Sequence, residues 1–78
     1  MTVCYLRVAT DYLEDAYRAA SIKDAVSEYR AIVDECNRFG NTSPEATIHI
    51  PDEKGNVHEY PDFILSAGPR GGVTKERT

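Results

Sequence analysis

The stretch SIKDAVSEYRAIVDECNRF, residues 21–39, decides the fold that the sequence predicts. Its apolar residues recur at intervals of one and three positions, which places them on one stripe of a helix with roughly 3.6 residues per turn. They are Ile22, Ala25, Val26, Tyr29, Ile32, Val33 and Cys36. Ser21 is typical of an N-cap, and Gly40 is typical of the residue that follows a helix end. We therefore expect an amphipathic helix, whose apolar stripe must be covered by a sheet or by a second protomer.

The segment before the helix divides into a clear strand and an ambiguous part. Residues 2–9 are rich in β-branched and aromatic residues and place Cys4, Leu6 and Val8 on one face, which we expect to meet the helix. Residues 11–20, DYLEDAYRAA, fit a short helix capped by Asp11, or a short strand over 17–20. The spacing of their apolar residues slightly favours the helix.

The segment after the helix reads as a β-hairpin over residues 45–66, EATIHIPDEKGNVHEYPDFILS. PDEKGN has turn chemistry, and VHEY begins the return strand. The inward-facing positions of the first strand are Ala46, Ile48 and Ile50. Thr47 and His49 alternate with them and are expected to face solvent.

These elements predict an α+β fold with the order β-α-β-β. We expect a small antiparallel sheet of about three strands, with one main amphipathic helix packed on one face. A short extra helix would precede the main one if residues 11–20 are helical. Residues 1–72 would form a single domain, and residues 73–78 a basic C-terminal tail or a short closing strand.

Composition indicates a soluble globular protein. The chain has 78 residues, of which 28% are charged and 41% hydrophobic. It has no apolar run near the roughly 20 residues that span a bilayer, and its N-terminus has no basic, signal-like segment. We expect a cytoplasmic protein without a membrane partner, in the host cytoplasm if a phage encodes it.

The two cysteines, Cys4 and Cys36, have neither CxxC spacing nor a histidine at ligand spacing. Cys36 lies on the apolar stripe, and Cys4 shares a face with Leu6. We expect two small buried thiols rather than a zinc site, and a disulfide is disfavoured in a reducing compartment.

Charge is distributed unevenly along the chain. The net charge of −4 combines −6 over residues 1–62 with +2 over residues 63–78. An acidic body disfavours direct binding to nucleic acid, and it suits a protein or ribonucleoprotein partner with a basic surface. The alternative is that the charge serves only solubility.

A row of carboxylates can occupy a groove built for phosphates, which is nucleic-acid mimicry. Asp24 and Glu28, four residues apart on one helix face, repel one another and so suggest a use for their charge. Arg70, in the loop GPRGG, could contact a partner. The candidate partner-binding residues are Glu14, Asp15, Asp24, Glu28, Asp34, Glu35, Asp52, Glu53 and Arg70.

The residues give no sign of catalysis. No serine or cysteine lies in a nucleophile motif or has a base at a recognisable spacing, so we expect no enzyme activity, cofactor or metal. One alternative remains open. His49 and His58 could lie close together across the hairpin and, with nearby acids, form a metal or acid–base site.

The helix over 21–39, the EATIHI/VHEY hairpin and the acidic body together make the chain resemble small proteins of phages and mobile elements, among them type I anti-CRISPR proteins. The resemblance is one of size, charge and architecture over most of the chain. It implies a small inhibitor that binds a host CRISPR-Cas surveillance complex and blocks its nucleic-acid-binding site by occlusion or charge mimicry. The residues also leave open a dimeric regulatory or antitoxin-like module, so we expect a monomer or a homodimer.

Overall fold

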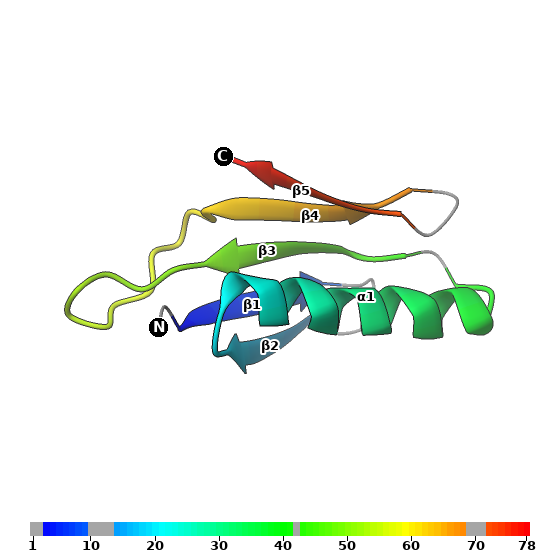
Figure 1. Cartoon of the computed structure of the whole chain (residues 1–78), viewed down its shortest axis with the longest axis horizontal. Coiled ribbons are helices and arrows are strands. Elements are labelled where there is room, and N and C mark those ends of the chain that lie inside the picture. The colour runs from blue at the N-terminus through cyan, green and yellow to red at the C-terminus, as the bar shows by residue number, and fades with distance from the viewer. Residues whose placement is uncertain (1–2, 10–13, 42, 69–71) are drawn as a thin grey trace.

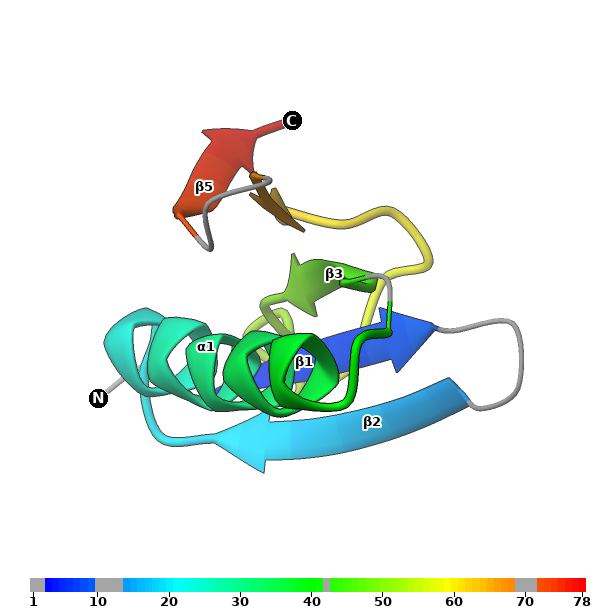
Figure 2. The same ribbon diagram turned by 90° about the vertical axis from the view of Figure 1, so that its right-hand side faces the viewer.

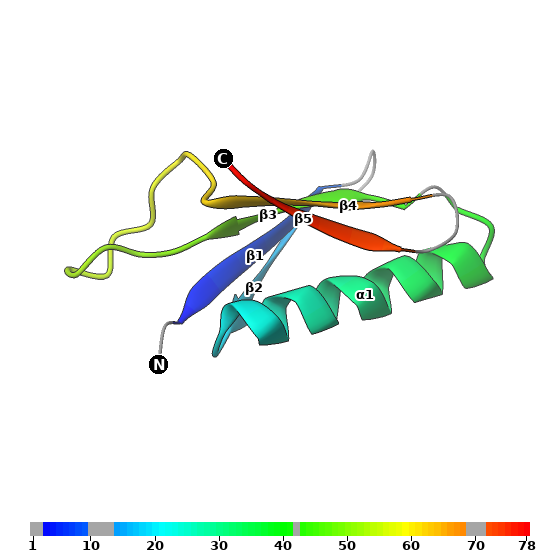
Figure 3. The same ribbon diagram turned by 45° about the horizontal axis from the view of Figure 1, so that its top comes forward.

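The computed structural model describes residues 3–9, 14–41, 43–68 and 72–78. Within these residues it has one antiparallel sheet with a helix on one face (Figures 1 and 3). The elements are β1 (Cys4–Ala9), β2 (Glu14–Ala19), α1 (Ile22–Arg38), β3 (Glu45–His49), β4 (Phe63–Ala67) and β5 (Val73–Arg77). The sheet order is β2-β1-β3-β4-β5, so β2 and β5 are its edges.

The predicted sheet of about three strands is wrong, because the sheet has five strands beside a single helix. The two additional strands are the edges, which the sequence offers only as alternatives to a short helix and a tail. Residues 73–77 form β5 rather than a tail, and they pair with β4 from Ala67↔Val73 to Phe63↔Arg77. A strand as polar as VTKER is hard to recognise, because an edge strand needs few apolar residues.

The helical interpretation of residues 11–20 is also wrong where the structure describes them. Glu14–Ala19 forms β2, and every residue of it pairs with a residue of β1. This pairing separates Ala16 and Tyr17, which a helix would place on one side. The predicted cap Asp11 lies outside the described residues.

The main helix and its caps are confirmed. The Ser21 side chain accepts a hydrogen bond from the backbone N–H of Asp24 at 3.1 Å. At the other end Gly40 has φ of 73°, the left-handed conformation that closes a helix, and its N–H donates to the carbonyl of Asn37. These local signals fix the helix ends independently of the rest of the fold.

The core forms where the apolar stripe of α1 meets the sheet. The predicted inward face is confirmed for Cys4, Leu6 and Val8 in β1 and for Ala46 and Ile48 in β3, whereas Ile50 lies beyond the end of β3 and is half-buried. The buried apolar residues are Cys4, Leu6, Val8, Ala25, Tyr29, Val33, Ala46, Ile48 and Leu65. The Tyr29 hydroxyl donates to the backbone carbonyl of Pro44, which ties the centre of the helix to the start of β3.

The return strand of the predicted hairpin begins later than expected. β3 and β4 pair through Ala46↔Leu65 and Ile48↔Phe63, but residues 57–60, VHEY, are not part of a strand. The connection forms a loop that projects beyond the sheet (Figure 1). The Asp62 carboxylate closes it by accepting a hydrogen bond from the backbone N–H of Ile50 at 2.7 Å.

His49 does not face solvent as predicted, since its side chain is only 6% exposed. It does lie on the sheet face opposite the helix, but the β3–β4 loop reaches it. Its Nδ1 lies 3.0 Å from the carbonyl of His58, and its Nε2 lies 2.9 Å from the Thr47 hydroxyl. A carbonyl only accepts, so Nδ1 donates to it, and in the neutral ring Nε2 accepts from the Thr47 hydroxyl. The ring therefore anchors the loop to β3.

Both cysteines are free thiols, Cys4 fully buried and Cys36 half-buried. The Cys4 thiol lies 3.4 Å from the carbonyl of Ser21. Burial, and then the nearby charge of Asp24, raises the pKa of this thiol. Within the described residues, no helix has the length and apolar character needed to cross a membrane.

We predict that the two histidines differ in their effect on stability. His49→Ala removes a buried ring and leaves the His58 carbonyl and Thr47 hydroxyl without their partner, which should cost about 1–3 kcal/mol of unfolding free energy. The matched change His58→Ala removes an exposed side chain and keeps the carbonyl, so it should cost less than about 0.5 kcal/mol. Urea unfolding followed by circular dichroism measures both. Equal losses would contradict the anchoring role of His49.

A second prediction concerns Tyr29 and alkaline pH. Burial, then the charges of Glu45 and Cys36, raises the Tyr29 pKa in the folded state above its ordinary value. Above a pH of about 10 the unfolded chain releases this proton first, so the stability from the raised pKa declines as pH rises. Tyr29→Phe should cost about 1 kcal/mol at neutral pH and flatten that decline. Unfolding curves between pH 8 and pH 11 would test it; an equally steep decline in the variant would contradict it.

Candidate functional site

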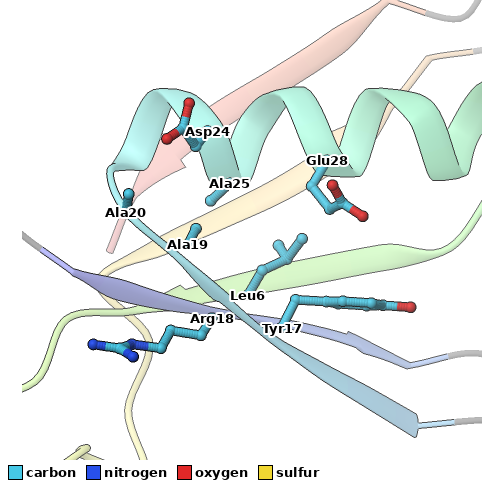
Figure 4. Close-up of a pocket in the computed structure, with 8 residues that line it drawn as sticks. All are labelled: Leu6, Tyr17, Arg18, Ala19, Ala20, Asp24, Ala25 and Glu28. Carbon is cyan, nitrogen blue, oxygen red and sulfur yellow. The ribbon is translucent and has the colours of Figure 1, made fainter.

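A groove of about 340 Å³ lies between α1 and the edge strand β2 (Figure 4). Its floor is apolar and comes from three elements, with Leu6 on β1, Ala19 on β2 and Ala25 on α1. Its rim carries the carboxylates of Asp24 and Glu28 from the helix. Arg18 of β2 also lines the groove, so the negative charge belongs to the helix side of its rim.

The groove exists because β2 is a strand with small residues beside the helix. Pairing of Leu6 with Tyr17 and of Cys4 with Ala19 puts Tyr17 and Ala19 on the sheet face that α1 covers. Alanines at 19 and 25 cannot fill the space between strand and helix, so the hollow remains open. Asp15 pairs with Val8 and lies on the same face, next along the strand.

The helix directs three of the predicted acidic residues to this side of the molecule. Asp24, Glu28 and Glu35 are separated by four and seven residues, so they form one flank of α1. Asp34 is adjacent in sequence to Glu35 but points roughly 100° away from it around the helix axis. The fold thus brings together four of the predicted residues, which we call the acidic flank: Asp15, Asp24, Glu28 and Glu35.

Tyr17 lies at the centre of the acidic flank. Desolvation raises the pKa of its hydroxyl, and the negative charges of Asp15, Glu28 and Glu35 raise it further, together with a side-chain hydrogen bond to Asp15. Asp15, Glu28 and Glu35 therefore lie near enough to the Tyr17 hydroxyl to raise its pKa. The same field would stabilise a positive charge placed there.

The orientation of the side chains separates those that face the groove from those that border it. In Figure 4 the Glu28 carboxylate points from the helix toward the strand, on the side where the Tyr17 ring extends. Asp24 lies near the start of the helix and points away from the floor. The Arg18 guanidinium extends away from the helix and from the Glu28 carboxylate.

The other predicted partner-binding residues lie elsewhere. Glu14 begins β2. Asp52 and Glu53 lie in the β3–β4 loop, where the Asp52 carboxylate accepts hydrogen bonds from the backbone N–H groups of Lys54 and Asn56, each at 2.9 Å. These backbone hydrogen bonds, that of Asn56 first, hold the Asp52 pKa below its ordinary value. Asp52 thus shapes the turn, and Arg70 lies outside the described residues.

The opposite face of the sheet offers a shallower depression of about 400 Å³, lined by Arg7, Glu45, Thr47 and Ile64 among others. It holds one acidic and one basic side chain, whereas the groove is lined by two acidic side chains, Asp24 and Glu28, and by Arg18. Among the described residues, no three histidine, cysteine or acidic side chains are placed to share a metal ion. The alternative site at His49 and His58 has instead one ring anchored in the loop and a backbone carbonyl from the other residue.

The apolar part of the groove is not predicted from the sequence. Tyr17 and Ala19 fall in the ambiguous segment 11–20, and Leu6 is predicted only as a core residue. The alternation of Asp15, Tyr17 and Ala19 was the available signal, since it is a strand pattern beside an edge. It was outweighed by the helical spacing of the same segment.

Comparisons with known proteins identify no relative. No protein-family model matches the chain, and neither curated proteins nor solved structures show significant similarity to it. The functional argument therefore depends on the geometry and charge of the chain itself.

We predict that Tyr17 reports on the acidic flank. Glu28→Gln removes one of the negative charges around its hydroxyl and should lower the Tyr17 pKa, although desolvation will keep it above the ordinary value. Asp34→Asn removes the same charge from another side of the helix and should leave the Tyr17 pKa unchanged. Titration of ¹³C-labelled tyrosine followed by NMR measures both. A similar shift in the two variants would show that net charge, rather than local geometry, sets the pKa.

Proposed function

We propose that this chain is a protein-binding inhibitor that docks its acidic flank on a basic, nucleic-acid-binding surface of another protein. The observation that carries the proposal is the convergence of Asp15, Glu28 and Glu35 on Tyr17, with Asp24 at the groove rim. Carboxylates spaced along one edge attract the same cationic side chains that bind phosphates. Occupying that surface excludes the nucleic acid.

The distribution of the remaining charge supports an oriented contact. The basic residues of β5, Lys75 and Arg77, lie at the opposite edge of the sheet from the acidic flank. They cover the ring of Phe63, at 5.3 and 5.8 Å from its centroid. A molecule with one acidic and one basic edge turns its acidic edge toward a basic surface during encounter.

The resemblance to type I anti-CRISPR proteins gives the proposal a specific form. The partner would be a CRISPR-Cas surveillance complex in the host cytoplasm, and the inhibitor would compete with target DNA. The alternative is a dimeric regulatory or antitoxin-like module, for which the open edges β2 and β5 are the available contacts. Light scattering at increasing protein concentration distinguishes a stable homodimer from a monomer that acts on another protein.

The decisive test is inhibition of DNA binding by a purified type I surveillance complex, measured by gel mobility shift. The protein should prevent binding of target DNA, and raising the salt concentration should weaken its effect because the contact is between charged groups. A charge-neutralised variant should need at least about tenfold more protein for the same effect. Its substitutions are Asp15→Asn, Asp24→Asn, Glu28→Gln and Glu35→Gln.

The matched control changes the same number of acidic residues on other surfaces, and it should inhibit as well as the unmodified protein. Its substitutions are Asp34→Asn, Glu53→Gln, Glu59→Gln and Glu76→Gln. The proposal fails if the unmodified protein leaves DNA binding unaffected and affinity capture from host lysate recovers no nucleic-acid-binding protein. Equal loss in the two variants would show that net charge alone is responsible.

A further inference from the structure

The geometry points to a specific docking mode: an extended basic segment of the partner pairs with the outer edge of β2 and places a lysine or arginine side chain in the groove beside α1. This inference rests on the proposed function, since it names the part of the partner that meets the acidic flank. Two independent features carry it, the open edge of β2 and the shape and charge of the groove.

The first feature is the backbone of β2. It runs for six residues, Glu14–Ala19, and pairs on one side only, with β1. It lies at the end of the sheet order, and Figure 2 shows no other described element along its outer side. Its outer N–H and C=O groups are therefore placed to pair with a further strand, the mode of peptide recognition in which backbone hydrogen bonds supply affinity.

The second feature is what such a strand would meet. Alternate side chains of an added strand point to the helix side of the sheet, where the groove lies beside β2. The methylene stem of a lysine or arginine fits against the half-buried Tyr17 and Ala19, above the fully buried Leu6 and Ala25, while its charged end reaches Glu28. An apolar residue would leave this carboxylate without a partner, and an acidic residue would be repelled. The groove therefore selects a basic side chain.

Charge also decides against a second copy of the chain as the occupant. Pairing of β2 with β2 around a two-fold axis would bring two acidic flanks together. The basic strand β5 could approach β2 of another copy with the helices on the same side, but repetition of that contact gives an open-ended assembly rather than a closed dimer. A basic segment of another protein matches the groove without bringing two acidic flanks together and without forming an open-ended assembly.

The test uses a defined probe, the acetylated and amidated heptapeptide TKVRVKT, which places three basic residues on one face of a strand. We expect it to bind the ¹⁵N-labelled protein with a dissociation constant below about 1 mM, since a short strand with few anchors binds weakly. The backbone amide signals of residues 14–19 and of Glu28 should shift most. Asp15→Asn combined with Glu28→Gln should weaken binding at least about tenfold, and Asp34→Asn with Glu53→Gln less than about twofold.

Two control peptides separate the backbone contact from simple charge attraction. The same peptide, N-methylated at its central arginine and at one neighbouring valine, keeps its charge but cannot form the hydrogen-bond ladder of a strand. It should therefore not shift the backbone amide signals of residues 14–19. A peptide with glutamine in place of the basic residues keeps the backbone and should bind at least about tenfold more weakly. Binding by the N-methylated peptide, shifts centred on another surface, or no binding at all would overturn the inference.

Failure of the docking mode can be distinguished from failure of the proposed function, because peptide binding and inhibition of DNA binding are measured separately. If the protein blocks DNA binding and the unmodified peptide leaves β2 unchanged, inhibition uses another part of the acidic flank and only the docking mode is wrong. If the peptide binds β2 as expected and no DNA-binding complex is inhibited, the docking mode stands and the inhibitory function fails. Growth of particle size with concentration in the absence of peptide would identify β5 of another copy as the occupant and would overturn the inference.

Discussion

The main constraint on this fold is that a single helix must cover the apolar face of a five-stranded sheet. A helix is about 10 Å across and neighbouring strands lie about 4.8 Å apart, so one helix shields about two or three strands. Here α1 packs most closely on β1 and β2, and the fully buried residues Tyr29 and Val33 sit at its centre. At the far side of the sheet the ring of Phe63 is covered by the long side chains of Lys75 and Arg77. The same arrangement leaves a groove at the near side, where alanines on β2 and α1 do not fill the space below the helix.

The sequence predicts what is determined locally. The cap at Ser21, the apolar stripe and Gly40 define the helix without reference to other elements, and alternation defines β1 and β3. The secondary structure of residues 14–19 is not determined locally, because the segment has both the apolar spacing of a helix and the alternation of a strand. Pairing with β1 decides in favour of the strand. His49 shows the same limit. Its face was predicted from alternation, but its burial depends on a loop that returns to it from His58.

The candidate site also has one part that the sequence predicts locally and one part that depends on the fold. The helix period alone places Asp24, Glu28 and Glu35 on one flank and separates them from Asp34. The meeting of that flank with Asp15 and Tyr17 could not be read from the sequence, because it requires β2 to be a strand on the side of α1 that carries the acids. The sequence therefore supplies a list of acidic residues without indicating which of them lie together in the fold.

Open edge strands expose unpaired backbone groups, and proteins limit the resulting self-association by placing charge there. In this chain the two edges carry opposite signs on the helix side of the sheet, with Asp15 on β2 and Lys75 and Arg77 on β5. Like edges repel, so symmetric pairing through either edge is disfavoured. In the proposed docking mode, the charge that keeps copies apart at β2 would also attract a basic partner, so the same carboxylates would serve protection from aggregation and recognition. An edge that only needed protection could carry charge of either sign, whereas β2 also lies beside a groove whose helix side is negatively charged.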